Sequence, residues 1–364
     1  MTWGEFDCVD LKGIACAVPD NIIENASYYD KYGQEAVDKF INITGVKKRC
    51  ISIKEQTASD LCFVAANNLI NTLKWEKDSI DCILFISQTP DYKLPATSCV
   101  LHKRLGLSEK CIAFDVNLGC SGYVYGLYIA CSLIKSGNLN RVLLLAGDTI
   151  SKVVSPEDRS TSMLFGDAGS ATALERTKGN KSSKSIKFAL KTKGQGFGNI
   201  IIPYGGFRNI EGEQSRTLRQ EGIIRSDYDL YMNGTEVFNF TINDVPSTIN
   251  EFIELQGIPK DGIDIFIPHQ ANLFMLKHIA KKIQISLDKM AVSLDRFGNT
   301  SIASIPITIV DTLTNKYNKS TDKLNILLAG FGVGLSWGVV FLELIPEICM
   351  PLIFSNEYWE VEGD

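Results

Sequence analysis

The chain has 364 residues, 45% of them hydrophobic and 22% charged, with a formal net charge of −5 at pH 7. This composition is typical of a globular protein with two or three domain-sized units, and without a block of like charges we expect no nucleic acid among its partners. No segment has 18 apolar residues without a charge, so we expect a cytoplasmic protein with no membrane span.

Short apolar runs alternate with helical patterns along the chain. Continuous runs of this length between helices are typical of buried strands in an α/β sheet. The predicted strands are CILFIS (82–87), CIAFDV (111–116), RVLLLAGD (141–148), IDIFIPH (263–269) and LNILLAGFG (324–332).

The predicted strands repeat at nearly one offset. ILFIS at 83 and IFIPH at 265 are 182 residues apart, and the two LLAG segments, at 144 and 327, are 183 apart. LGC ending at Cys120 and FGN ending at Asn299 are 179 apart. The sequence therefore predicts a duplicated α/β unit, with halves at 1–176 and 177–364 and an enlarged Gly- and Arg-rich loop at about 194–227.

The ten cysteines show neither a CxxC pair nor a disulfide framework, so most are expected to be small core side chains, and no metal site is predicted. Cys120 is the exception because it begins a helical apolar pattern of Val124, Leu127, Tyr128 and Cys131. The free N–H groups of a helix N-terminus favour a thiolate. We therefore expect a lowered thiol pKa and a nucleophilic Cys120.

Histidine occurs only three times. His102 and His278 lie in charged, helix-like surroundings and are expected at the surface. His269 follows a predicted strand, where catalytic groups of α/β folds concentrate. The duplication places Asn299 at a helix start equivalent to that of Cys120, so the three could converge, although an ordinary N-cap explains Asn299 equally well.

In six segments the sequence resembles the β-ketoacyl-acyl carrier protein synthase III family of the thiolase superfamily. These are AFDVNLGCSGYVYGL, EDRSTSMLFGDAGSATAL, MNGTEVFNF, IPHQANL, LDRFGNTSIASIP and LLAGFGVGLSWG, in family order from residue 8 to about 345. The resemblance implies a five-layer αβαβα fold of two similar halves. It also implies a homodimer and a catalytic set of Cys120, His269 and Asn299.

The activity implied is a decarboxylative Claisen condensation. An acyl group held on Cys120 reacts with a malonyl thioester to give a β-ketoacyl thioester. Coenzyme A or phosphopantetheine thioesters are then substrates, acyl carrier protein is a partner, and no cofactor is bound permanently. The alternative is an acyltransferase that passes the acyl group to an alcohol or amine. A thiolase would need a second catalytic cysteine in a Cys-Gly context, which Cys349 does not provide.

Further site residues follow from the resemblance alone. The backbone N–H groups of Cys120 and Val333 are expected to form an oxyanion hole. In the segment QTPDYKLPATSC, Leu94 or Tyr92 is expected to reach the acyl pocket of the partner in a dimer. Residues expected to bind the coenzyme A or carrier arm are Arg159, Gly234, Phe238, Ala271, Asn272 and Phe331.

Three positions depart from the best-known housekeeping members. Lys39 stands near the place of a tryptophan, Ile43 that of an arginine, and Thr235 that of an asparagine. These changes predict weaker binding of coenzyme A. The long loop at 194–227 and the tail from Ile345, both larger than in those members, favour a synthase from a specialised acyl pathway.

Overall fold

Two mixed β-sheets form the centre of the protein. The computed structural model describes residues 2–177, 185–317 and 320–360. Within these residues the six-stranded sheet has the order β17-β2-β8-β7-β5-β6 and the five-stranded sheet the order β1-β9-β16-β15-β14. The strands of the first are β2 (Val9–Val18), β5 (Cys82–Ile86), β6 (Ile112–Val116), β7 (Arg141–Asp148), β8 (Ala168–Arg176) and β17 (Ile353–Phe354). Those of the second are β1 (Thr2–Phe6), β9 (Ile186–Thr192), β14 (Ile265–Pro268), β15 (Leu324–Gly332) and β16 (Ser336–Leu344).

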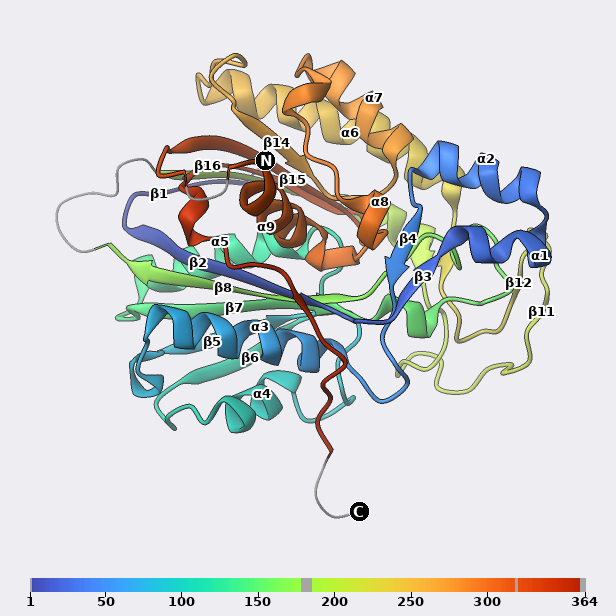
Figure 1. Ribbon diagram of the computed structural model, residues 1–364, viewed down its shortest axis with the longest axis horizontal. Helices are drawn as coiled ribbons and strands as arrows, with labels where there is room; N and C mark the ends of the chain where they lie inside the picture. The colour runs from blue at the N-terminus through green and yellow to red at the C-terminus, as the bar shows by residue number, and fades with distance from the viewer. Residues whose placement is uncertain (1, 178–184, 318–319, 361–364) are drawn as a thin grey trace.

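Helices fill the space between the sheets and cover their outer faces (Figure 1). In the middle layer, α5 and α9 pack against both sheets, while α3 and α4 cover the six-stranded sheet and α6 and α7 the five-stranded one. This is the expected five-layer αβαβα arrangement. The helices are α1 (Tyr29–Tyr32), α2 (Gln34–Thr44), α3 (Ala58–Leu73), α4 (Thr97–Leu105), α5 (Gly122–Ser136), α6 (Gly234–Leu255), α7 (Leu273–Ile283), α8 (Leu294–Phe297) and α9 (Ser304–Lys316).

The five predicted strands are confirmed as β5, β6, β7, β14 and β15. β5 is parallel to both β6 and β7, and all five of its side chains are buried. β14 is likewise parallel to β15 and buried. A parallel strand covered on both faces needs apolar side chains on both, which explains why these strands are continuous apolar runs in the sequence.

The middle layer depends on small residues in α5. A Cβ on Gly122 would lie 2.5 Å from Ile302 Cδ1, and one on Gly126 would lie 2.8 Å from Leu144 Cδ1. The glycines therefore allow α5 to lie directly on β7 and on the segment that precedes α9. This close packing brings the start of α5 next to the residues that follow Asn299.

The first and last strands pair with the sheet of the opposite half. β1 is antiparallel to β9 in the five-stranded sheet, and β17 is parallel to β2 in the six-stranded sheet. The division at 176/177 therefore stays a prediction about the duplicated unit, because each sheet contains one strand from beyond that division.

The predicted long loop contains short regular elements. It includes the 3₁₀ helix η4 (Gly194–Asn199) and the strand β10 (Ile200–Ile201), which pairs with β13 (Tyr231–Met232). A small hairpin of β11 (Thr217–Leu218) and β12 (Ile224–Arg225) forms its far end. The remaining short strands, β3 (Ile22–Glu24) and β4 (Lys48–Cys50), pair with each other.

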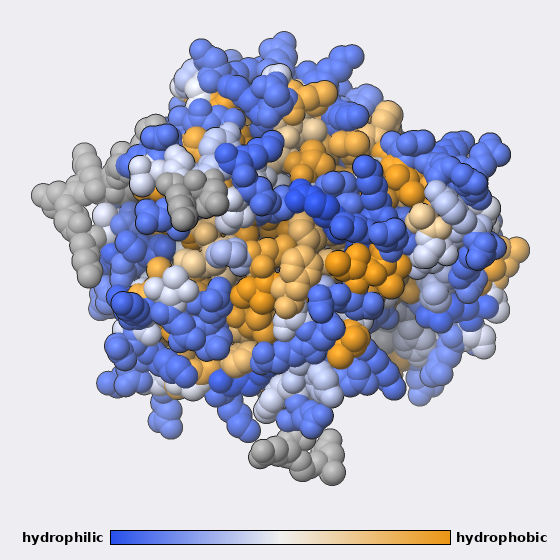
Figure 2. All heavy atoms as spheres, in the orientation of Figure 1, coloured by the Kyte–Doolittle hydropathy of each residue, from blue (hydrophilic) through white to orange (hydrophobic). Residues whose placement is uncertain are grey.

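Apolar side chains gather in the middle of one face of the molecule (Figure 2). A cavity of about 840 Å³ lies beside α9 and the segment after β16, and Leu313, Leu352 and Phe354 are among its lining residues. It shares no lining residue with the cavity around Cys120 described below. Among the described residues, no helix combines the length and apolar character needed to cross a membrane.

Candidate active site

Cys120 lies at the start of the central helix, as predicted. Helix α5 begins at Gly122 with Ser121 as its N-cap, and Cys120 is 7% exposed. Strand β15 ends directly against the cysteine, because a Cβ on Gly332 would lie only 2.7 Å from Cys120 Cβ. This contact brings the N–H of the next residue, Val333, towards the sulfur.

The expectation of a lowered thiol pKa is wrong. Burial raises the pKa of Cys120 to about 12. Hydrogen bonds from the Ser301 hydroxyl and from the backbone N–H groups of Cys120 and Val333 lower this pKa, but the Asp148 carboxylate raises it. A helix N-terminus contributes only about 0.3–1 kcal/mol at an exposed site, and desolvation of a buried thiolate outweighs that contribution.

His269 lies buried at the end of β14. Its backbone N–H donates to Ala329 O at 2.7 Å, and its ring packs edge-on against Phe331 with centroids 5.3 Å apart. Burial lowers the pKa of His269 to about 3, while hydrogen bonding with the Ser301 backbone acts in the opposite direction. The imidazole is therefore neutral near pH 7 and can act as a hydrogen-bond donor but not as a cation.

Ser304 orients this imidazole. Its hydroxyl oxygen lies 2.7 Å from His269 Nδ1 and also accepts from the Gln270 N–H at 3.4 Å. With its oxygen accepting from Gln270, the Ser304 hydroxyl can donate its hydrogen to Nδ1. In the tautomer that accepts this hydrogen bond, the ring proton lies on Nε2.

Asn299 lies between α8 and the 3₁₀ helix η6 (Ser301–Ala303). Its N–H donates to Leu164 O at 2.9 Å, and its carbonyl accepts from Gly166 N–H at 3.1 Å. The side-chain Oδ1 accepts from Ser301 N–H at 3.0 Å. Asn299 thus accepts from a local backbone group, but the N-cap of η6 is Thr300, so the alternative interpretation of Asn299 as an ordinary N-cap is not borne out. With Oδ1 used in this way, the side chain offers its amide N–H groups as donors.

The three predicted residues line one small cavity of about 90 Å³, and it holds both backbone segments of the expected oxyanion hole. Among the expected binding residues, Gly234, Ala271, Asn272 and Phe331 also line it. Two of these also have a structural role. Asn272 Oδ1 accepts from Met275 N–H at the start of α7, and Phe331 packs on His269.

The other expected residues lie outside this lining. Arg159 and Leu94 are exposed, and Phe238 stacks on Phe274 with ring centroids 5.8 Å apart. Helix α6 presents Val237 and not Phe238 to the cavity. The two remaining histidines, on α4 and α7, are partly exposed and also lie outside the lining.

Sequence reasoning missed several polar residues of the site. Gln88 and Ser301 line the cavity, Ser304 orients His269, and Asp148 lies buried close to Cys120. The run of small hydroxyl residues in GNTSIAS was the available signal for two of them. Among the described residues, no group of three or more His, Cys, Asp or Glu is placed to hold a metal ion.

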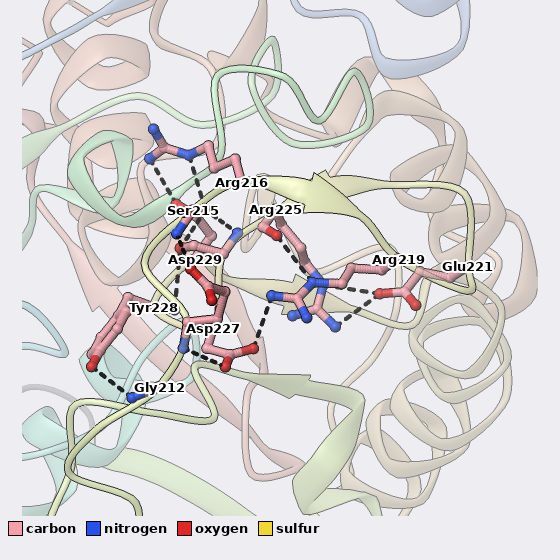
Figure 3. Close-up of polar contacts among 11 residues, drawn as sticks. Gly212, Ser215, Arg216, Arg219, Glu221, Arg225, Asp227, Tyr228 and Asp229 are labelled. Carbon is pink, nitrogen blue, oxygen red and sulfur yellow. Dashed lines mark hydrogen bonds and ion pairs between the residues drawn. The ribbon is translucent and has the colours of Figure 1, made fainter.

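The long loop and the residues directly after it supply apolar side chains at the cavity wall. Ile200 comes from the loop, and Leu230 and Met232 come from the residues that follow it. Polar contacts hold this segment in place (Figure 3). Arg216 forms two hydrogen bonds with the buried Asp229, at 2.9 and 3.0 Å. Arg219 pairs with Asp227, and Arg225 pairs with Glu221. The charged network thus fixes the chain immediately before Leu230.

Comparisons with known proteins agree with this geometry. The family model 3-Oxoacyl-[acyl-carrier-protein (ACP)] synthase III matches residues 114–194, and the model of the family's C-terminal part matches residues 253–344. The first includes Cys120, and the second includes His269, Asn299 and Val333.

Individual relatives cover nearly the whole chain. A β-ketoacyl-[acyl-carrier-protein] synthase III of Clostridium perfringens is 33% identical over 333 residues, which are 91% of this chain and 98% of the relative. The crystal structure of 3-oxoacyl-(acyl-carrier protein) synthase from Burkholderia xenovorans LB400 is 39% identical, with a TM-score of 0.91. It covers 97% of this chain and 99% of that one. The chain therefore belongs to the 3-oxoacyl-[acyl-carrier-protein] synthase III family and is a thiolase-like condensing enzyme, an acyltransferase of fatty acid biosynthesis.

Proposed function

We propose that the protein condenses an acyl group carried on Cys120 with a malonyl thioester, releasing carbon dioxide. The observation that carries this proposal is the convergence of Cys120, His269 and Asn299 on one buried cavity. A sulfur nucleophile, a neutral imidazole and a carboxamide are the groups that this two-step reaction requires.

In the first step, the Cys120 sulfur attacks the carbonyl carbon of an acyl thioester. The carbonyl oxygen becomes an oxyanion, and the backbone N–H groups of Cys120 and Val333 are directed at this position beside the sulfur. Fixed backbone donors stabilise such charge without reorganising during the reaction. Collapse of the intermediate expels the donor thiol and leaves the acyl group on Cys120.

In the second step, a malonyl thioester loses its carboxylate as carbon dioxide. The electron pair of the broken C–C bond moves towards the thioester oxygen, where His269 Nε2–H and the Asn299 amide donate hydrogen bonds. The carbanion then attacks the acyl carbon on Cys120, and cleavage of that thioester restores the sulfur. Neutral donors suit this step because a cationic imidazole would be strongly disfavoured in so buried a position.

The substrates are proposed to arrive on coenzyme A or on the phosphopantetheine arm of acyl carrier protein. Gly234, Ala271 and Asn272 at the cavity wall support a path for such an arm. Arg159 is exposed and remains a proposed contact for the distal part of the carrier. The assignment to a specialised pathway stays a prediction, supported by the loop residue Ile200 and by Leu230 and Met232 directly after the loop, which line the cavity wall.

A homodimer is proposed for the active form. Strand β6 is the last strand of its sheet within the described chain, and Ile112 on it is 50% exposed. An open strand edge of this kind can pair with the same strand of a second copy. Leu94 is 77% exposed on the segment before α4, which suits the proposed contact with the acyl pocket of the partner.

The test combines acyl loading and decarboxylation on the same protein. Wild type is incubated with acyl-coenzyme A and acyl-carrier thioesters of different chain length, and the intact protein is weighed and peptide-mapped. We expect one acyl group per chain, on Cys120, followed by carbon dioxide release and product formation with a malonyl thioester. Cys120→Ala should lose loading, whereas Cys99→Ala, which changes an exposed cysteine, should not. Loading without carbon dioxide release on any malonyl donor would instead support transfer to an alcohol or amine.

A further inference from the structure

A carboxylate is buried beside the nucleophile without a cation to balance it. Asp148, the last residue of β7, is 0% exposed and forms no ion pair within the described residues. Its Oδ1 accepts from Ser87 Oγ (2.9 Å), Gln88 N–H (2.7 Å) and Thr89 Oγ1 (3.3 Å). Oδ2 has no hydrogen-bond partner among the described residues. A buried carboxylate with one unused oxygen is unusual because its desolvation is costly.

Ser301 connects this carboxylate with the sulfur. Its hydroxyl oxygen lies 3.8 Å from Cys120 Sγ. Burial raises the pKa of Asp148, and the nearby Ser301 hydroxyl is the strongest influence that lowers it, although it does not reach hydrogen-bond geometry with Oδ2. Ser301 also has a φ of +49°, a conformation that costs a non-glycine residue energy and that clusters at functional sites.

It is energetically unfavourable for the Cys120 sulfur and the Asp148 carboxylate to be charged at the same time. Two anions buried side by side repel strongly, and the charge on Asp148 accordingly raises the pKa of Cys120. A nearby proton acceptor is therefore needed when Cys120 reacts.

The other titratable groups around the pair are poor acceptors. His269 has a pKa of about 3 because of burial, so it binds a proton weakly. Cys62 on α3 also faces Asp148, and burial raises its pKa to about 12, so it remains a thiol. Neither β5, β8 nor η6 contributes a lysine or arginine that pairs with the carboxylate among the described residues. Asp148 is thus the base best placed to take the proton.

We propose that Asp148 receives, through the Ser301 hydroxyl, the proton that Cys120 loses on acylation; this inference rests on the proposed role of Cys120 as nucleophile. As the sulfur electron pair forms the S–C bond, the S–H proton passes to Ser301 Oγ and the serine proton passes to Oδ2. When the donor thiolate leaves, Ser301 returns a proton to it and Asp148 is ionised again. Asp148 does not touch the substrate. It acts through Ser301 and is therefore a positioning residue.

Alkylation of Cys120 tests the coupling without any acyl donor. The rate at which iodoacetamide modifies the Cys120 peptide is followed by mass spectrometry from pH 5 to 11. A coupled pair loses its two protons in two macroscopic steps, so wild type should show a first apparent pKa, a plateau, and a second rise that is still incomplete at pH 11, because burial raises the pKa of Cys120 to about 12. Asp148→Asn should show a single apparent pKa, and this pKa should be lower than that of the second step in wild type, because the repelling anion is gone.

Single-turnover acylation tests the proton path itself. At pH 7, Asp148→Asn and Ser301→Ala should each acylate at least about 100-fold more slowly, which is the usual effect of losing a general base. The double variant should be no slower than the slower single variant, because both residues serve one path. Carbon dioxide release from malonyl thioester should stay within about threefold, since His269 and Asn299 are intact.

The matched control is Asp167→Asn. Asp167 is also fully buried and accepts from Ser52 N–H at 2.8 Å and Ser151 N–H at 3.0 Å, but it does not line the cavity. This variant should retain the two-step alkylation profile.

An unchanged profile in Asp148→Asn, acylation at the wild-type rate, or equal losses of acylation and carbon dioxide release would each overturn the inference. If Asp148→Asn does not fold, the rates of acylation and of carbon dioxide release are compared in Ser301→Ala, and this comparison tests the inference. Failure of the proposed function would look different: wild type itself would load no acyl group or release no carbon dioxide, while its alkylation profile could still be measured.

Discussion

The Ser304 hydroxyl oxygen lies 2.7 Å from His269 Nδ1, so this serine orients the buried imidazole. Ser304→Ala removes that partner and lets the ring adopt the other tautomer. We expect carbon dioxide release to slow by roughly 10-fold, with acyl loading of Cys120 unchanged. Ser293→Ala, which loses a buried hydroxyl contact with Thr308 at 2.7 Å, is the control and should release carbon dioxide normally. Equal rates in the two variants would argue against the tautomer role.

The two half-reactions should respond differently to mutation. His269→Ala and Asn299→Ala each remove one donor to the thioester oxygen, so decarboxylation should slow by about 10²–10³-fold. Acylation should survive in part because its oxyanion donors are backbone groups. Cys120→Ala should lose loading and condensation yet retain some decarboxylation. Single-turnover mass measurements and carbon dioxide release separate these effects, and wild-type decarboxylation in the two donor variants would refute the mechanism.

The low pKa of His269 makes a prediction about pH. An ordinary histidine gains a proton near pH 6.5, whereas burial keeps His269 neutral down to about pH 3. Decarboxylation by folded enzyme should therefore show no titration of this group between pH 5 and 8. A step of activity near pH 6.5 that disappears in His269→Gln would contradict the assignment.

The lowered pKa of His269 also affects the free energy of unfolding. Below pH 6.5 the unfolded chain binds a proton at residue 269 that the folded chain does not, so folding stability is lost as the pH falls. The slope contributed by this residue is at most about 1.4 kcal/mol per pH unit. Urea unfolding at pH 7 and pH 4.5 should show a larger loss for wild type than for His269→Gln. An equal loss in the two proteins would contradict the neutral state.

We expect Asp229 to hold in place the chain segment that brings Leu230 to the cavity wall. Its side chain is only 4% exposed and accepts from Ser226 N–H and from Arg216. Asp229→Asn should raise the KM for acyl thioesters and speed proteolysis within 205–230, at a stability cost of about 1–3 kcal/mol. Glu221→Gln changes a more exposed carboxylate, which pairs with Arg225, and should have little effect, because exposed ion pairs contribute about 0.2–1 kcal/mol. Identical proteolysis of both variants would argue against the role of Asp229.

Leu94 should influence the acyl chain through the dimer. Leu94→Ala should leave light-scattering mass unchanged while shifting preference towards longer acyl groups, since a smaller side chain leaves more room. Phe207→Ala, which changes another exposed apolar residue, is the control. A monomer at micromolar concentration, or an unchanged acyl preference, would contradict the proposed assembly.

Different patterns in the sequence predicted the buried strands and the position of Cys120: continuous apolar runs for the strands, and a helical apolar pattern that begins at the cysteine. Buried parallel strands such as β5 are unbroken apolar runs, and His269 directly follows one of them, β14. The expected carrier-arm contact of Phe238 stays a prediction: Val237 and Thr241, four positions apart, line the cavity, whereas Phe238 stacks on Phe274 of α7. A one-residue step rotates a helix by about 100°, so a motif alone does not fix which side chain faces a site.

Other parts of the site were beyond prediction because tertiary packing creates them. Ser301 and Ser304 look like ordinary cap and turn residues in the sequence, and only the approach of η6 to β7 and α5, and of α9 to β14, gives them partners. Asp148 ends a strand, as many solvated aspartates do, and its complete burial depends on the surrounding layers. The thiol pKa was misjudged for a related reason: the sequence shows the helix start but not how much water the fold excludes.

The exchange of β1 and β17 between the two sheets has a consequence for synthesis and for engineering. The six-stranded sheet is incomplete until residue 354 has left the ribosome, although most of its strands are made within the first half of the chain. Until then, β2 has an unpaired edge. The exposed backbone groups of that edge can pair with a wrong segment. Fragments cut at 176/177 would each lack a strand that the other carries, so they should form native sheets only when mixed.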